Sequence, residues 1–377
     1  MISGWREVKL DELAEVKGGK RLPKGKLLTT SKTKHPYIRI TDFDGFKINL
    51  NNIQYVEEDV QPSIARYIVN SGDIILSNVG TLGLSAIVPP ELDNANLTEN
   101  CVKIILNKSE VNNKFLYYQL ISPEMQDLIV GLDVGSTQPK LPMYNIKNMD
   151  IVLPPLEEQK AIAEVLSSLD DKIDLLHRQN KTLEELVQTL FRQRFIEEAK
   201  DEWEVRFFSD LVDVSSGKSL KREFFDDNGK YKVLGANGEI GKTNNWLFDE
   251  KLIFTGRVGT LGNIFINNVK AWLSDNTLVI QPKQYFYYIY FLLKSFKLEN
   301  YNVGSTQPLI RQSDLKNIEI SIPSKDIISA FEKKSDDIFG KINKNQNQIK
   351  TLENMRDTLL PKLMSGEVKI KLGDSND

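Results

Sequence analysis

The sequence predicts an α+β protein with two similar mixed α/β modules, joined by two long helices that form an antiparallel coiled coil with a pseudo-twofold internal repeat. Three observations predict this fold. The hexapeptide VGSTQP occurs at 134–139 and again at 303–308, the front of each repeat consists of short β-branched runs, and the back of each repeat carries a long heptad pattern.

The repeat extends well beyond the hexapeptide. Trp5, Gly19 and Lys20 recur 198 positions later as Trp203, Gly217 and Lys218. Further blocks recur in the same order: NVGTLG at 78–83 as RVGTLG at 257–262, FLYYQLIS at 115–122 as YIYFLLKS at 288–295, and KTLE at 181–184 as KTLE at 350–353. The shift falls from 198 to 169, so the second copy is shorter, and the variable part of the first lies between Lys20 and Ser122.

The front of each copy is predicted to be strand-rich. Short apolar, β-branched runs are separated by Gly, Asn and Pro: PYIRI, GDIILSNVG and CVKIIL in the first copy, and YKVLG, KLIFTGRVG and TLVIQP in the second. Short helices are predicted to follow at NKFLYYQLIS and YFYYIYFLLKS. Each front is therefore a compact mixed α/β module.

The back of each copy is predicted to be one long helix. Prolines and glutamates in LPPLEEQK suit a helix N-terminus. Apolar residues then alternate in steps of four and three, at Ile162, Leu166, Leu169, Ile173, Leu176, Leu183, Val187 and Leu190, and in the second copy at Phe331, Ile338, Ile342, Ile349, Leu352 and Leu359. Each seam carries an asparagine, and if Asn180 meets Asn345 the two amides would fix the register.

A single stripe of this kind is typical of a helix packed on its own domain. Two matched stripes favour pairing of the helices with each other, and a twofold relation between the copies makes that pair antiparallel. Ile162 to Leu190 is 29 residues, about 43 Å at 1.5 Å per residue. The pair would then act as a spacer about a dozen base pairs long.

These patterns set the predicted domain boundaries. Residues 1–154 form the first module, 155–198 the first spacer helix, 199–323 the second module, and 324–377 the second spacer helix and tail. Pro361 is expected to kink or stop the second helix before Gly366.

Composition narrows the classes of function. The 377 residues are 40% apolar and 27% charged, which is typical of a soluble folded protein, and short hydrophobic runs without a signal peptide predict a cytoplasmic location. One cysteine, Cys101, excludes an internal disulfide framework, and His35 and His177 are too few for a metal cluster, so neither a metal nor a cofactor is expected.

No catalytic motif is present in the sequence. G-x-S-x-G, H-E-x-x-H, C-x-x-C and the Asp/Asn-Pro-Pro-aromatic motif of a methyltransferase are all missing, so the sequence predicts a protein without catalytic residues. A net charge of −3 does not by itself favour nucleic-acid binding, so that function has to be argued locally.

Local basic segments supply that argument. Lys17–Lys34 holds seven basic residues and no acid, and GKSLKR at 217–222 is a shorter version in the second copy. Such a run is usually a solvated loop. Its functional reading is a set of phosphate and base contacts. The predicted DNA-binding residues are Lys20, Arg21, Lys24, Lys26, Asn78 and Thr81 in the first copy, and Lys218, Lys221, Arg222, Arg257 and Thr260 in the second.

The chain has the order of a module, a helix, a second module and a second helix. The segment GSTQP…LPPLEEQKAIAEVL leads into the first helix, and YKVLGANGEIGKT, GRVGTLG and LSDNTLV lie in the second module. In this order and in these segments, the chain resembles the DNA-specificity subunit of type I restriction-modification systems over essentially its whole length. The resemblance implies that the modules are target recognition domains, each reading half of a split double-stranded DNA site. It implies that two modification (methyltransferase) subunits dock on the helices and that restriction subunits join them. S-adenosylmethionine and ATP would then bind to those partners, and this subunit would carry out no chemistry.

Two features of this pattern leave alternatives open. Glu157, Glu158 and Gln159 are candidate partner contacts, but the second copy has IPSKDIISAF at that place. The GSTQP residues Ser136, Thr137, Gln138, Ser305, Thr306 and Gln307 are predicted to hold a turn, or to touch DNA as well. The alternative function is a twofold scaffold that binds two protein partners and no DNA.

Overall fold

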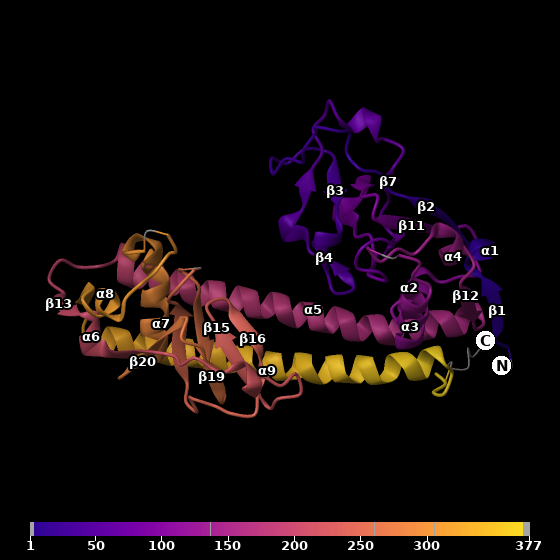
Figure 1. The fold of residues 1–377 in the computed structure, drawn as a ribbon. Coiled ribbons are helices and arrows are strands. Elements are labelled where there is room, and N and C mark those ends of the chain that lie inside the picture. The colour runs from indigo at the N-terminus through magenta and orange to yellow at the C-terminus, as the bar shows by residue number, and fades with distance from the viewer. Residues whose placement is uncertain (1–3, 136, 260, 305, 372–377) are drawn as a thin grey trace. The chain divides into compact units, whose positions relative to one another are not determined.

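The computed structural model describes residues 4–135, 137–259, 261–304 and 306–371, and the chain divides into two compact units. Unit one contains the described residues up to Leu175 and from Gln348 onward, and unit two contains Leu176–Asn347. Two long helices are shared by both units, namely α5 (Leu156–Arg192) and α9 (Lys325–Met364) (Figure 1). Each unit therefore consists of one module with part of each long helix.

Unit one contains twelve strands among the described residues. They are β1 (Arg6–Lys9), β2 (Ala14–Gly18), β3 (Pro36–Ile38), β4 (Phe43–Asp44), β5 (Lys47–Ile48), β6 (Gln54–Tyr55), β7 (Ile68–Val69), β8 (Ile74–Ser77), β9 (Ser85–Ile87), β10 (Ala95–Leu97), β11 (Cys101–Leu106) and β12 (Asp150–Leu153). Its short helices are α1 (Leu10–Leu13), α2 (Asn113–Leu120), α3 (Pro123–Gly131) and α4 (Met143–Lys147).

Unit two repeats this element order in shortened form. Its strands are β13 (Glu204–Phe207), β14 (Val212–Ser216), β15 (Tyr231–Gly235), β16 (Gly238–Thr243), β17 (Leu252–Gly256), β18 (Ile264–Asn267), β19 (Ala271–Leu273), β20 (Thr277–Pro282) and β21 (Glu319–Ile322). Its short helices are α6 (Phe208–Leu211), α7 (Phe286–Ser295) and α8 (Gln312–Lys316).

The sheets of the two units have the same topology. The main sheet runs β2-β11-β8-β9 in unit one and β14-β20-β17-β18 in unit two, with all neighbours antiparallel. A second sheet is built on one parallel pair in each unit, β3 with β10 and β15 with β19. The first and last strands of each module also pair, β1 with β12 and β13 with β21. Both pairs are antiparallel, with Arg6 opposite Leu153 and Glu204 opposite Ile322.

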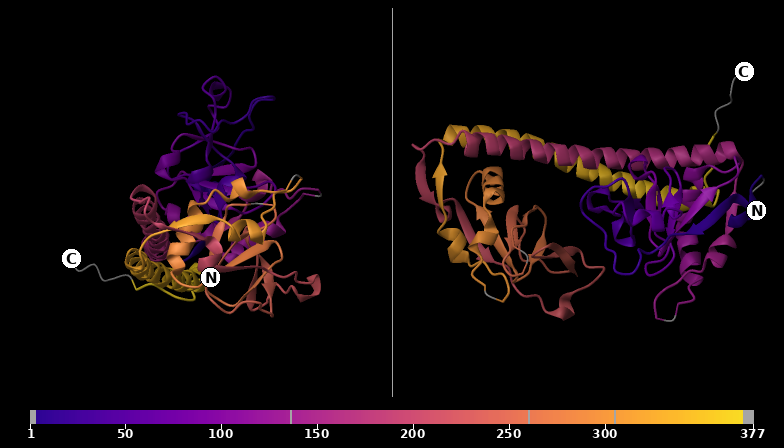
Figure 2. Two further views of the ribbon diagram at one scale, coloured as in Figure 1. Left: turned by 90° about the vertical axis from the view of Figure 1, so that its left-hand side faces the viewer. Right: turned by 90° about the horizontal axis from the view of Figure 1, so that it is seen from above.

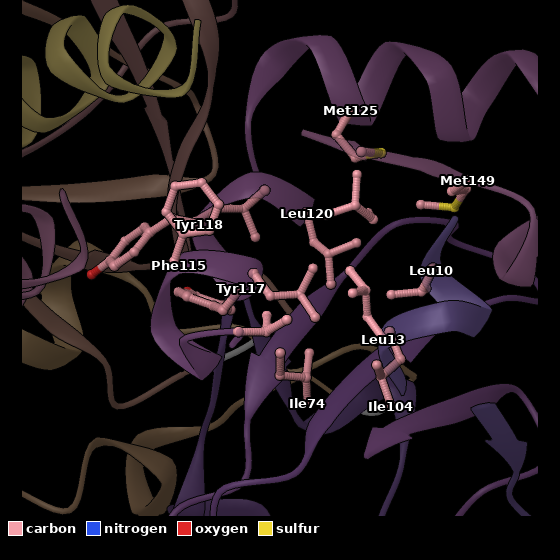
Figure 3. Packing of buried hydrophobic residues seen from close by; sticks show 14 of the residues in the cluster. Leu10, Leu13, Ile74, Ile104, Phe115, Tyr117, Tyr118, Leu120, Met125 and Met149 are labelled. Carbon is pink, nitrogen blue, oxygen red and sulfur yellow. The ribbon is translucent and has the colours of Figure 1, made fainter. Parts of the chain in front are cut away.

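The main sheet is buried on both faces. In β8, Ile74 and Leu76 enter one core and Ile75 enters another, as expected because successive side chains of a strand point to opposite faces. The first core lies between the sheet and the helices, where side chains from α1, α2, β8 and β11 meet (Figure 3). The second core separates the main sheet from the second sheet, so each module has three layers.

The two long helices are antiparallel in both units, as the heptads predicted. In unit one, Arg356 Nη1 of α9 lies 3.0 Å from Asp170 Oδ1 of α5. In unit two, Phe191 of α5 and Phe195 of the π-helical turn Gln193–Glu197 that follows it pack on Phe331 of α9, with ring centroids 5.7 and 5.2 Å apart. The helices lie side by side in Figures 1 and 2. Helix α9 continues through Pro361 and ends at Met364, before Gly366, whose φ is 70°.

The extra length of unit one lies in its second sheet. Between β3 and β8 the chain forms the hairpin β4–β5 and strands β6 and β7, whereas unit two places the single hairpin strand β16 between β15 and β17. Within the described ranges, no helix is long and apolar enough to cross a membrane, and no group of three or more His, Cys, Asp or Glu could hold a metal ion.

Cys101 offers a chemical probe of this architecture. It opens β11, is fully buried between the two sheets, and burial raises the pKa of its thiol to about 12. Because only the thiolate is nucleophilic, we expect a disulfide reagent at pH 8 to leave the folded chain unlabelled and to react promptly once guanidinium unfolds it.

The control is a chain with Cys101→Ser and Ser31→Cys, whose one thiol lies at an exposed position. That chain should react at once in the folded state. Equal labelling rates for both folded proteins would contradict the buried position of β11.

Candidate nucleic-acid interface

In each unit, four short segments meet at one end of the main sheet, and we call them the loop cluster. In unit one they are the basic loop after β2, the GTLG turn after β8, the turn between β10 and β11, and the GSTQP loop. Unit two has the same four segments after β14, after β17, between β19 and β20, and before α8. Most of the predicted DNA-binding residues lie in these two clusters.

Backbone hydrogen bonds fix the segments in the same way in both units. In unit one the N–H groups of Gly19, Lys20 and Asn78 donate to the carbonyls of Cys101, Leu97 and Asn100 at 3.0, 2.8 and 2.9 Å. In unit two the N–H groups of Gly217, Lys218 and Arg257 donate to the carbonyls of Thr277, Leu273 and Asn276 at 3.2, 2.9 and 2.8 Å. The turn between β10 and β11, and its counterpart before β20, is thus the point to which the other segments are tied.

The predicted site residues do not include this central turn. LTEN at 97–100 and LSDN at 273–276 are equivalent, but only their leucine and asparagine are identical. The sequence signal for this turn was the order shared by the two copies: a leucine, a hydroxyl residue, an acidic residue and an asparagine. The acid and amide are exposed in unit two, where Asp275 and Asn276 join the surface of the cluster.

The repeated glycine is required by close backbone contact. A Cβ on Gly19 would lie 2.0 Å from the carbonyl oxygen of Thr98, and one on Gly217 would lie 2.2 Å from that of Ser274. An aromatic side chain then holds the carbonyl of the next residue: Tyr37 Oη donates to Lys20 at 2.8 Å, and Trp272 Nε1 donates to Lys218 at 2.8 Å. The lysines are thereby placed at the edge of the main sheet with their side chains exposed.

The GSTQP loop is closed by the residue two positions before its glycine. Asp133 Oδ1 accepts the N–H groups of Gly135 and Lys140 at 2.8 Å each, and Asn302 Oδ1 accepts those of Gly304 and Leu309 at 2.9 Å each. These amides hold the pKa of Asp133 below its usual range. Asp133 and Asn302 therefore close this turn in the two units.

The loop also packs on the GTLG turn. The N–H groups of Gly80 and Gly259 donate to the carbonyls of Pro139 and Pro308 at 2.9 Å. Four side chains of the loop are exposed beside that turn, namely Thr137, Gln138, Thr306 and Gln307. Ser136 and Ser305 lie outside the described residues.

The predicted basic residues are exposed in both clusters. Lys20, Arg21, Lys24 and Lys26 are exposed in unit one, as are Lys218, Lys221 and Arg222 in unit two. Some meet acids: Lys26 Nζ lies 2.7 Å from Asp59, Lys221 Nζ lies 3.8 Å from Glu223, and Arg21 bonds Glu99. Exposed ion pairs of this kind are weak, so a phosphate can replace the carboxylate.

The turn residues differ in availability. Asn78 is 8% exposed and its Nδ2 donates to the Leu141 carbonyl at 3.3 Å, so its side chain is held inside the turn. Arg257, its equivalent, is half-buried and has no hydrogen-bond partner at Nε within the described structure. Thr81 is exposed, and Thr260 lies outside the described residues.

The candidate partner contacts at the start of α5 are mostly used internally. Gln159 is 1% exposed, accepts the Asn112 N–H at 2.8 Å and donates to the carbonyls of Glu110 and Pro154. Glu158 accepts from Trp5 Nε1 at 3.1 Å, whereas Glu157 is exposed and pairs with Lys160. Gln159 therefore ties α5 to the module, and Glu157 is the residue that remains accessible.

Two modules with the same backbone frame but different exposed side chains, each packed on paired long helices, define a DNA-reading adaptor protein. Comparison with known proteins agrees. The family model of the type I restriction modification DNA specificity domain matches residues 2–185 and 200–354. The MjaIX specificity subunit of Methanocaldococcus jannaschii is 30% identical, over 97% of this chain and 94% of that protein.

Other relatives have the same organisation. The HindI specificity subunit of Haemophilus influenzae is 23% identical over 81% of this chain and 89% of its own length. The crystal structure of the type I S subunit from M. genitalium superposes with a TM-score of 0.59 at 20% identity, covering 98% of this chain and 96% of that one, which shows the fold. The chain belongs to the type I restriction-modification DNA specificity family, as the sequence predicted. It is a DNA specificity subunit, which is a non-catalytic component of a complex with DNA and other subunits.

The close contact at Gly217 can be tested directly. We expect Gly217→Ala to lower the free energy of unfolding by about 1 to 3 kcal/mol, because the added methyl group collides with the Ser274 carbonyl. Hydrogen exchange of the Lys218 amide should also accelerate, since its bond to Leu273 weakens. The control is Gly340→Ala in α9, where an added Cβ meets nothing within 4 Å. Equal effects of the two substitutions would show that the contact does not constrain the loop.

Proposed function

We propose that each module binds one half of a bipartite duplex DNA target through its loop cluster. Residues 1–154 and 199–323 would be the two target recognition domains, and the helices would set the distance between the half-sites. One observation carries this proposal: both clusters use the same backbone hydrogen bonds to present different side chains. A constant frame with a variable surface is what two readers of different sequences require.

The charges of the clusters support DNA as the ligand. The net charge of the chain is −3, yet the segment Lys17–Lys34 has seven basic residues and no acid. Lys20, Lys24 and Lys26 of the basic loop and Thr81 of the GTLG turn are all exposed, so the loop cluster offers both charged and neutral phosphate donors. Affinity for duplex DNA would then come largely from phosphate contacts. Arg257 and the exposed amide side chains of the clusters, Gln138, Asn276 and Gln307, would contact base edges.

The partner subunits would bind elsewhere on the chain. We infer that two modification subunits dock on the long helices, with Glu157 as an accessible contact, and that restriction subunits join that assembly. The methyl donor S-adenosylmethionine and ATP would bind to those partners. Asn180 and Asn345 would fix the register of the helices, since Asn345 Nδ2 donates to Asn180 Oδ1 at 2.9 Å.

Salt-dependent binding tests the basic loop. We expect Lys20→Gln with Lys24→Gln to weaken binding of the assembled methyltransferase complex to any duplex and to reduce the slope of log K against log salt by about two, or about one per lost phosphate contact. Fluorescence anisotropy across a salt series measures both quantities. Lys108→Gln is the matched control, because Lys108 is exposed beyond the opposite end of β11. Unchanged affinity and slope in the double variant would support the scaffold that binds no DNA.

Base reading by unit two is tested separately. Arg257→Ala should relax the sequence requirement at one position of a single half-site, at a cost of about 1 to 3 kcal/mol, and leave the other half-site unchanged. Mapping of methylated sites in a host that expresses the complex measures this. Lys218→Gln, which removes a phosphate contact, should reduce methylation at all sites without changing the motif. Relaxation in both half-sites would refute the assignment of one half-site to each module.

A further inference from the structure

The helix pair buries polar groups at two places along its seam. In unit one Asp170 is 8% exposed, and its carboxylate accepts Tyr118 Oη at 2.7 Å and Arg356 Nη1 at 3.0 Å. In unit two Asn345 is 1% exposed and its amide donates to Asn180 at 2.9 Å. Asp170 and Asn345 therefore each meet a polar group of the other helix, whereas the buried hydroxyl of Ser335 donates to the Phe331 carbonyl of its own helix.

The internal repeat places an apolar residue at every equivalent position. With the shift of 169 between the helices, Asp170 corresponds to Phe339 and Arg356 corresponds to Val187. The asparagines follow the same rule, because Asn180 corresponds to Ile349 and Asn345 to Leu176. Tyr118 of α2 is likewise replaced by Phe291 of α7, which packs against Phe339 with ring centroids 6.1 Å apart.

The antiparallel register then defines what each residue would face in any other pairing. Facing residues have numbers that add to 525 or 526, as for Asn180 with Asn345 and Asp170 with Arg356. Replacing α9 by a second α5 lowers each residue number on that side by the repeat shift of 169, so facing residues would then add to 356 or 357. Replacing α5 by a second α9 raises the numbers by 169, so facing residues would add to 694 or 695. Two copies of α5 would set Asp170 against Val187 and Asn180 against Leu176. Two copies of α9 would set Arg356 against Phe339 and Asn345 against Ile349.

We propose that these four polar residues form a pairing code that makes α5 and α9 complementary to each other and rejects a second copy of the same helix. The pairing of unlike helices joins the Asp170 carboxylate to the Arg356 guanidinium and the Asn345 NH2 group to Asn180, while Asn345 Oδ1 accepts no hydrogen bond within the described structure. Each pairing of like helices loses these cross-helix contacts and sets two charged groups and two amides against apolar side chains, which leaves only Tyr118 as a partner of Asp170 and Asp357 as a partner of Arg356. The partner that fits the α5 seam is therefore an α9 seam, and every assembled pair holds one module of each kind. This inference concerns pairing alone and stands whether or not the modules bind DNA.

A cut chain tests the code. A protease site inserted between Lys200 and Asp201, where both residues are exposed, allows the full folded chain to be cleaved into two fragments of different mass. The cut protein is unfolded in denaturant and refolded, and native mass spectrometry then measures the masses of the complexes that the fragments form. We expect complexes of one N-terminal with one C-terminal fragment. A statistical mixture with dimers of like fragments would overturn the proposal.

Substitutions then change the code in a defined direction. Asp170→Val with Asn180→Leu makes α5 apolar where it would face Val187 and Leu176 of a second α5. Dimers of the N-terminal fragment should then increase about tenfold or more, and a tenfold change corresponds to about 1.4 kcal/mol. Glu185→Val with Lys181→Leu is the matched control, because these residues pair at 4.0 Å with side chains 62% and 72% exposed. No increase in the first variant, or an equal increase in the control, would overturn the proposal.

A second measurement uses the uncut chain, so the result does not depend on refolding of fragments. Asp170→Arg and Arg356→Asp should each lower the thermal midpoint, because each leaves two like charges together in the seam. The two substitutions combined restore opposite charges and should recover more than half of the combined loss. A combined loss equal to the sum of the single losses would show that the pair fills space without recognising its partner.

Discussion

The packing of α5 against α9 is the constraint on which both modules depend. Each module's core is completed by the helix that belongs to the other repeat. Leu360, Leu363 and Met364 of α9 join the core of unit one, while Val187 and Phe191 of α5, with Phe195 just after it, join the core of unit two. A helix paired only with its own module would leave these side chains in water, at a cost of about 1.5 to 3 kcal/mol for each large apolar residue. The duplication of the chain therefore contributes directly to the burial of both cores.

A rigid backbone frame explains how one fold can present two different surfaces. The loop clusters are held by hydrogen bonds between backbone N–H and carbonyl groups and by a glycine in contact with a carbonyl. These backbone contacts do not depend on which side chains the other loop residues have. Arg257 takes the place of Asn78 on that frame, and the lysine carbonyl is held by Tyr37 of β3 in unit one but by Trp272 of β19 in unit two. Substitution at exposed positions can then change the surface that the loops present without changing where the loops lie.

The sequence predicted the repeat, the heptads and most strands because these depend on local periodicity. It did not predict which polar side chains are used inside the fold. Asn78, Gln159 and Asp133 are polar residues in loops or at helix ends, which is equally typical of binding residues and of structural ones. Only their tertiary partners distinguish the two cases: the Leu141 carbonyl, the Asn112 amide and the amides of the GSTQP loop. Likewise, the strand predicted at PYIRI ends at Ile38, because the bonds between Arg39 and Asp42 close a short helical turn.

The second copy lacks the LPPLEEQ motif, yet it preserves the contact that the motif makes. In unit one, Gln159 of α5 accepts the N–H of Asn112, the residue that caps α2. The equivalent residue of α9 is Ile328, and Tyr285, which precedes α7, has a φ of 56° and offers no side-chain cap. Glu332, one turn later in α9, accepts the N–H groups of Tyr287 and Tyr288 at 3.0 to 3.1 Å instead. Burial raises the pKa of Glu332, but these amides at the positive end of α7 favour its carboxylate. Both long helices therefore bind the start of the short helix of their own repeat, through residues that no sequence alignment would match.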